Sequence, residues 1–339
     1  MSRPDTLTWL AGHELRLGWR DWLSMMTAGR RARMKTIVIV LAVFAAFMHL
    51  VAYWMVGRYA GEGIDPDKTT LVVVSGTVLA SWSLLLSQAM ESVTRAFYAR
   101  SDLDLILASP VSARKVFAIR IARIAVSVSA LAILLASPFI NVLAVLGGPR
   151  WLAGYGVVTA MGAVATALAV ALTVALFRTI GARRTRLIAQ IVAAVIGAAF
   201  VIALQIGAIF AYGTLSRFVL LQSAWFVERA PDVNSAVWWP ARAVLGDFTA
   251  LAAVATLGLA LLGGAVALFS GRFGDHALAA AGVSQTVVRQ RRWSRNFRRA
   301  SPQRVLRQKE WTLLRRDPWL LSQTLMQMLY LLPPALLLW

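Results

Sequence analysis

Few residues able to do acid–base or metal chemistry lie in the long apolar segments of this sequence. His49, Asn141 and Gln205 are the side chains there with substantial hydrogen-bonding capacity. Ionisable residues inside a membrane segment usually mark ion-coupled transport or intramembrane catalysis. A single histidine among apolar residues more often bonds to a neighbouring helix than binds a ligand, and we expect that role for His49.

Motifs typical of catalytic or nucleotide-binding chemistry are absent from the sequence. It contains neither an HExxH zinc motif nor a GxSxG nucleophile motif, and it has no cysteine. It also lacks a GxxxxGK[ST] phosphate loop. We therefore expect that the chain is not an enzyme and has no catalytic, metal-binding or cofactor-binding residues. If its work is driven by ATP, the ATP must bind to a partner subunit.

A short leucine-rich segment lies in the polar connection over residues 91–123. Ser101 and Asp102 offer N-cap oxygens, and Asp104 stands three residues after Ser101. This pattern predicts a short helix over about residues 102–108, which Pro110 would end. The residues expected to contact a partner ATPase are Asp102, Leu103, Asp104, Leu105, Ile106 and Leu107. The leucines either pack back under the protein or dock in a groove on the partner, and we favour docking.

A short internal repeat links the two ends of the chain. Residues 13–26 (HELRLGWRDWLSMM) align without gaps with residues 309–323 (KEWTLLRRDPWLLSQ). The recurring residues are Glu14 with Glu310, Arg20 with Arg316, and Asp21 with Asp317. Both segments are basic and rich in tryptophan, which predicts amphipathic helices at the membrane interface. Glu14 and Asp21 share one helix face, which we expect to meet basic groups, while Arg20 turns toward lipid phosphate.

Composition and apolar runs predict an integral membrane protein. Of the 339 residues, 59% are hydrophobic and 15% charged, against about 25% charged in soluble domains. A bilayer core needs about 20 apolar residues per helix. Six complete runs have this length: Thr36–Val56, Thr70–Met90, Ile124–Leu146, Leu152–Phe177, Leu187–Tyr212 and Phe248–Phe269. With Trp319–Trp339 as a seventh, terminal span, we expect an all-α, polytopic transmembrane helical bundle preceded by an interfacial amphipathic helix.

The distribution of basic residues predicts the orientation of these spans. Of the 35 Lys and Arg residues, 29 lie in the N-terminal segment and the second, fourth and sixth connections, and 6 lie in the others. Because cytoplasmic loops are enriched in Lys and Arg, the N-terminus is predicted to be cytoplasmic. The same rule explains the basic stretch over residues 289–309, so we expect no nucleic-acid partner.

The connection between the fifth and sixth spans, residues 213–247, is long and aromatic. Its large aromatic residues are Phe218, Trp225, Phe226, Trp238 and Trp239. Such residues either form part of an interfacial aromatic belt or line an exit for an amphipathic substrate, and we favour the belt.

Taken together, these features resemble the membrane subunit of type-2 ABC exporters. The resemblance is carried by the interfacial segment with Glu14 and Arg20-Asp21, by RSDLDLILASPVSARKVFAIR (Arg100–Arg120), and by the long outer connection. DLDLILASPVS in particular is similar to the "DLDLLLSLPV"-type stretch of bacterial permeases of this group. The resemblance covers residues 1 to about 275, and the restart at 303–339 looks like fused members with two halves. It implies a partner ATPase on the cytoplasmic face, residues 102–108 as the coupling helix and residues 215–230 as an outer re-entrant element.

We therefore predict a multi-pass permease of the bacterial inner membrane that exports an unknown substrate with energy from a separate ATPase. Its expected parts are a six-span half (residues 1–275), a basic cytoplasmic linker (276–302) and the start of a second half (303–339). Its partners would be the ATPase, membrane lipid, and a second permease half or another copy of itself. The alternative is a non-transporting assembly or regulatory subunit that recruits a partner through its cytoplasmic loop.

Overall fold

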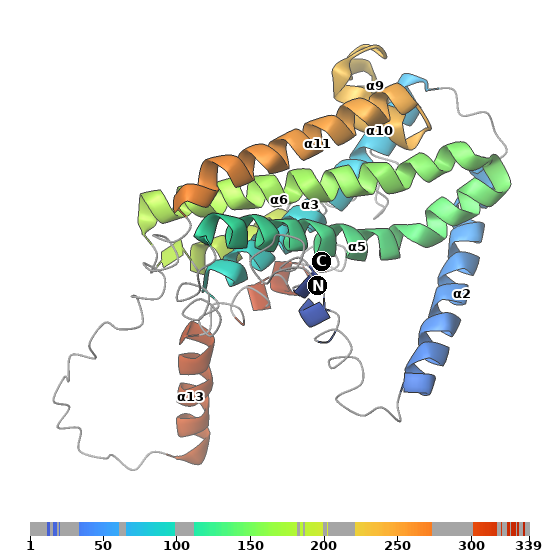
Figure 1. Ribbon diagram of the computed structural model, residues 1–339. Helices are drawn as coiled ribbons and strands as arrows, with labels where there is room; N and C mark the ends of the chain where they lie inside the picture. Colours follow the sequence, from blue (N-terminus) through green and yellow to red (C-terminus); the bar gives the residue numbers. More distant parts are fainter. Residues whose placement is uncertain are drawn as a thin grey trace.

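The computed structural model describes residues 34–60, 66–98, 112–181, 187–198, 221–272 and 301–316 continuously, together with isolated positions elsewhere. Within these residues all regular secondary structure is helical, which confirms the predicted all-α class. The long helices lie side by side in a bundle, from which α13 projects at one end (Figure 1).

Five helices are long and apolar enough to cross a membrane, and they contain five of the predicted spans. They are α2 (Met34–Ala60), α3 (Lys68–Tyr98), α5 (Ala113–Gly147), α6 (Ala153–Ile180) and α11 (Phe248–Phe269). The span predicted over Phe248–Phe269 coincides with α11. These helices support a membrane protein.

The other two predicted spans are described only in part. Residues Leu187–Ala198 form a shorter apolar helix within the predicted fifth span. Most of the rest of that span, and most of the seventh, lies outside the described residues. The count of five therefore refers to the described part of the chain.

Two helices are much longer than a bilayer core requires. α3 has 31 residues and α5 has 35. At 1.5 Å per residue, these helices extend over roughly 45 and 50 Å, against about 30 Å of hydrocarbon. α3 thus continues to Tyr98, past Met90, where the predicted second span ends. α5 begins at Ala113, eleven residues before the predicted span, directly after Ser112, whose side chain makes no capping hydrogen bond.

α6 is the central helix of the bundle and lies between α11 and α5 (Figure 1). Two-thirds of its most apolar window is buried, more than in any other of the five long helices. Small residues allow its neighbours to approach closely: a methyl group added at Gly162 would come within 2.1 Å of the Ser129 hydroxyl of α5. The buried Thr166 donates its hydroxyl hydrogen bond to the Gly162 carbonyl of its own helix. The core of the bundle is therefore apolar and built on small residues.

A proline lies inside α5, and the helix changes direction in its last third (Figure 1). Pro138 has no N–H to donate to the carbonyl of Leu134, four residues earlier. The Ser137 hydroxyl donates to that carbonyl at 3.0 Å and replaces the missing donor. A proline is thus accommodated in a segment where water is scarce.

Candidate functional site

Three phenylalanines join the ends of α3, α5 and α6. The ring of Phe97 lies 6.2 Å from that of Phe117 and 5.4 Å from that of Phe177, centroid to centroid. All three side chains are buried. Beside them the Arg120 guanidinium donates to the Ala96 carbonyl at 3.4 Å. We call Phe97, Phe117 and Phe177 the aromatic junction.

The aromatic junction involves the two helices that flank the predicted coupling segment in the sequence. Asp102, Leu103, Asp104, Leu105, Ile106 and Leu107 are outside the described residues. The two helices that flank them in the sequence are described: α3 ends at Tyr98 and α5 begins at Ala113. Arg120 of α5 is buried against α3. Both ends of the connection are therefore attached to one packed cluster.

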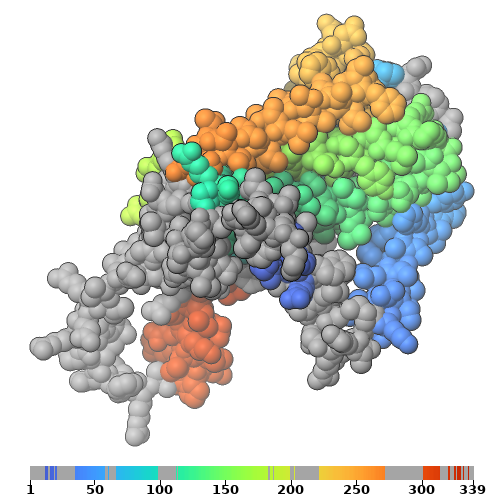
Figure 2. All heavy atoms as spheres, viewed as in Figure 1, coloured from blue at the N-terminus to red at the C-terminus, as the bar shows by residue number. Residues whose placement is uncertain are grey.

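The repeated acidic and basic residues are only partly described. Glu14, Asp21 and Asp317 lie outside the described residues, whereas Arg20 is helical and exposed. Glu310 is exposed on α13 (Pro302–Arg316), the helix that ends at Arg316. The side chains of residues 302–313 are all exposed, and α13 stands out from the bundle in the space-filling view (Figure 2). Residues 309–316 of the C-terminal copy are therefore helical.

A chain of hydrogen bonds crosses three helices in one half of the bundle. The Tyr155 hydroxyl of α6 donates to Asn141 Oδ1 of α5 at 2.6 Å. Asn141 Nδ2 lies 3.3 Å from His49 Nε2 of α2, and His49 Nδ1 lies 2.8 Å from the Ala45 carbonyl oxygen. Every donor faces an acceptor when His49 is neutral with its proton on Nδ1. We call His49, Asn141 and Tyr155 the polar triad.

The expectation that His49 bonds to a neighbouring helix is confirmed, but the sequence reasoning missed Tyr155. A usable signal was present in the sequence. Asn141 and Tyr155 each stand seven residues from Gly148, the turn between α5 and α6, whose φ is +97°. In an antiparallel helix pair, residues equally distant from the turn lie at similar depth. Gln205 is outside the described residues.

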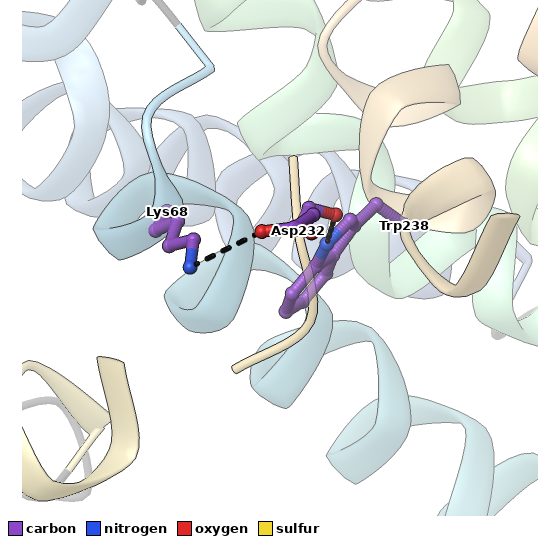
Figure 3. A network of polar contacts seen from close by, with 3 residues as sticks. All are labelled: Lys68, Asp232 and Trp238. Atoms are coloured by element: carbon purple, nitrogen blue, oxygen red, sulfur yellow. Dashed lines mark hydrogen bonds and ion pairs between the residues drawn. The ribbon is translucent and has the colours of Figure 1, made fainter. Parts of the chain in front are cut away.

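The outer connection forms a small packed cap on the first turns of α3. It contains α9 (Ala224–Arg229), a 3₁₀ turn, η3 (Ala236–Trp238), and α10 (Trp239–Val244). The Trp238 indole is buried and donates to the Asp232 carbonyl at 3.0 Å, while the Asp232 carboxylate lies 3.8 Å from Lys68 Nζ (Figure 3). Trp238 is therefore a core residue of this cap, whereas Trp225 and Trp239 are exposed and remain available to an interfacial belt.

Two aspartates cap helices near this outer segment. Asp247 accepts hydrogen bonds from the Thr249 hydroxyl at 2.6 Å and from the Ala250 amide at 3.1 Å, and these bonds hold its pKa below the ordinary value. Asp67 accepts from the Thr70 amide at 2.7 Å, and its hydrogen bonds with Thr70 likewise lower its pKa. Both carboxylates stabilise the first turn of a helix.

Within the described residues, no group of three or more His, Asp or Glu side chains could hold a metal ion. Comparison of the chain with family models, with curated proteins and with solved structures finds no match. The function is therefore argued from the residues and their arrangement.

Proposed function

We propose that this chain is the permease component of an ATP-driven exporter of the type-2 ABC class, with ATP hydrolysed by a separate subunit. In this proposal it lies in the bacterial inner membrane with a cytoplasmic N-terminus, and the substrate moves between two permease halves. The multi-span helical bundle, the missing phosphate loop and the Asp102–Leu107 segment support it.

The observation that carries the proposal is the aromatic junction. Phe97 is the residue before the last of α3, Phe117 lies in the first two turns of α5, and the Phe97 ring packs against both Phe117 and Phe177 of α6. A displacement of that loop by a partner would therefore reach the central helix through packed side chains. Packed cores transmit such displacements because they have low compressibility.

The basic surface around this loop and the repeated segments complete the proposed partner face. Arg114 and Lys115 are exposed at the start of α5, and Glu310 is exposed on α13. In the proposal, the face of Glu14 and Asp21 meets basic groups on this side, and α13 lies at the membrane interface. Exposed pairs of this kind stabilise by less than about 1 kcal/mol each.

The test asks whether a phosphate-loop ATPase is encoded beside this chain, co-purifies with it and hydrolyses ATP; absence of such a neighbour would count against the proposal. Leu103→Asp and Ile106→Asp place a carboxylate in the proposed groove. Burying a leucine stabilises by roughly 1.5–3 kcal/mol, and burying an unpaired carboxylate adds a further cost. We expect each variant to weaken ATPase binding at least about tenfold, which corresponds to about 1.4 kcal/mol.

The matched control is Val237→Asp, because Val237 is an exposed apolar residue of η3 (Ala236–Trp238), outside the proposed partner face. It should bind the ATPase as the unaltered chain does. Undiminished binding by both loop variants would reject the coupling assignment. An ATPase that binds through the loop but shows no ATP-dependent change in the helices would favour the alternative, a non-transporting regulatory or assembly subunit.

A further inference from the structure

The two halves of α2 differ in burial, since residues of the second half contact α5, although Leu50, Tyr53, Trp54 and Met55 are exposed there too. From Val38 to Phe47 nearly all its large apolar side chains are exposed. Further along, Ala52 and Ala60 are buried, and Gly57 lies against Leu146 of α5. In Figure 1 α2 meets α5 near the end of α5 and its other end points away from the bundle. The contact between α2 and the bundle therefore belongs to residues 48–60.

The polar triad lies at the start of this contact. It supplies hydrogen bonds between α2 and α5 and between α5 and α6, at 3.3 and 2.6 Å. At the far end, a methyl group added at Gly147 would come within 2.6 Å of the Ala60 carbonyl oxygen. Residues 48–60 of α2 are thus held against α5 by close packing at one end and by hydrogen bonds at the other.

The two halves respond differently to displacement in a bilayer. Moving the apolar residues 38–47 exchanges one lipid contact for another, because lipid tails are as apolar as these side chains. Moving His49 away from Asn141 leaves a ring nitrogen and an amide hydrogen without partners in hydrocarbon. The displacement of α2 that costs the least free energy therefore keeps the hydrogen bonds of the polar triad intact.

We propose that the polar triad is the fixed point about which the inner half of α2, residues 35–47, moves relative to α5 and α6. This motion does not require the proposed transport function and holds equally for a regulatory subunit. Tyr155 acts as a positioning residue: its hydroxyl orients the Asn141 amide so that Nδ2 faces His49.

The experiment is a pair of spin-label distance measurements in lipid nanodiscs. The native chain has no cysteine, so introduced thiols are the sole labelling sites. The outer pair is Met55→Cys with Val145→Cys and the inner pair is Val40→Cys with Val126→Cys, all four at exposed positions. In the otherwise unaltered chain, the outer pair should give a narrow distance distribution and the inner pair a broad one.

Tyr155→Phe and Asn141→Leu should both broaden the outer distribution. The fraction of molecules in which α2 is displaced from α5 should rise about threefold, and at most about twentyfold, for each interhelical hydrogen bond that is lost. The control is Thr159→Val on α6, because its exposed hydroxyl donates only to the Tyr155 carbonyl of the same helix. This variant should leave both distributions unchanged.

Two results would overturn the proposal. One is an inner pair as narrow as the outer pair in the chain with an intact polar triad. The other is an outer distribution unchanged by Tyr155→Phe. Should Asn141→Leu fail to accumulate, Tyr155→Phe decides alone, since it removes one hydroxyl group and keeps the ring.

Discussion

Gly258 of α11 lies against the backbone of Ala160 in α6, so close that an added methyl group would come within 2.9 Å of the Ala160 carbonyl oxygen. Such an approach is possible only for glycine, because backbone cannot move aside as a flexible side chain can. The contact between α6 and α11 is extensive. A substitution of Gly258 tests it directly.

Gly258→Ala should destabilise the protein by roughly 1–3 kcal/mol, the usual cost of overpacking a core. The matched control is Gly263→Ala on the same helix, where nothing lies within 4 Å of the added methyl group. That change should be neutral or stabilising by up to about 1 kcal/mol, because alanine favours helix. Thermal unfolding in detergent compares the two, and equal midpoints would contradict the close contact.

The outer cap offers a second comparison, between Trp238 and Lys68. Trp238→Ala should cost roughly 3–5 kcal/mol, since it removes a buried indole. Lys68→Ala should cost less than about 1 kcal/mol, because the Asp232 side chain of that ion pair is 98% exposed. Tryptic cleavage at Arg229 and Arg242 should accelerate in the first variant only. Similar cleavage rates would show that the ion pair and not the indole holds the cap.

Asp247 predicts an acid-dependent loss of stability. Its hydrogen bonds with Thr249 and Ala250 hold the pKa of the folded state below the ordinary value of about 3.9. The stability that the Asp247 charge contributes is therefore complete only well above the unfolded-state pKa, from about pH 5, and is lost as the pH falls through the folded-state pKa. Asp247→Ala should cost about 0.5–2 kcal/mol at neutral pH.

Asp247→Asn is the control for this prediction, because it keeps a capping oxygen without a titrating group. Unfolding temperatures measured from pH 7 to pH 3 should converge for the native chain and Asp247→Ala, and should fall less for Asp247→Asn. A constant difference between the native chain and Asp247→Ala over the whole range would show that the charge contributes nothing.

The orientation is tested by fusing a reporter that is active only in the cytoplasm. The 29-to-6 division of Lys and Arg predicts activity after Arg186 and none after Arg150. Fusion after Gly181, the residue following α6, should behave as fusion after Arg186 does. The reverse pattern would place the aromatic junction and the connection between α3 and α5 outside the cell, away from ATP.

Hydropathy located the centres of the described spans well, but it located the ends of two of them, in α3 and α5, poorly. It missed the first turns of α5 because Arg114, Lys115 and Arg120 interrupt the apolar run. Arg114 and Lys115 are exposed, whereas Val116, Phe117, Arg120 and Ile121 are buried against the bundle. A helix that is half basic and half buried has too low an average hydropathy to be recognised by that average alone.

The sequence was less informative about contacts between helices. Spacing from Gly148 places Asn141 and Tyr155 at equal depth, but their meeting also requires both helices to be rotated so that these residues face each other. That rotation is set by small residues such as Gly154, which packs against Ile140. Side-chain packing along the whole α5–α6 pair determines this rotation, and no short sequence pattern predicts it.

The bend at Pro138 has a mechanical consequence for α2. Asn141, Leu146 and Gly147, the residues of α5 that meet α2, all lie beyond the proline. The segment from Pro138 to Gly147 acts as an arm about 14 Å long, so a change of about 10° in the bend would carry its tip roughly 2 Å. Because proline has already removed one backbone hydrogen bond there, such a change strains α5 less at this point than elsewhere along its length. The angle at Pro138 therefore sets the direction of the segment of α5 against which α2 packs.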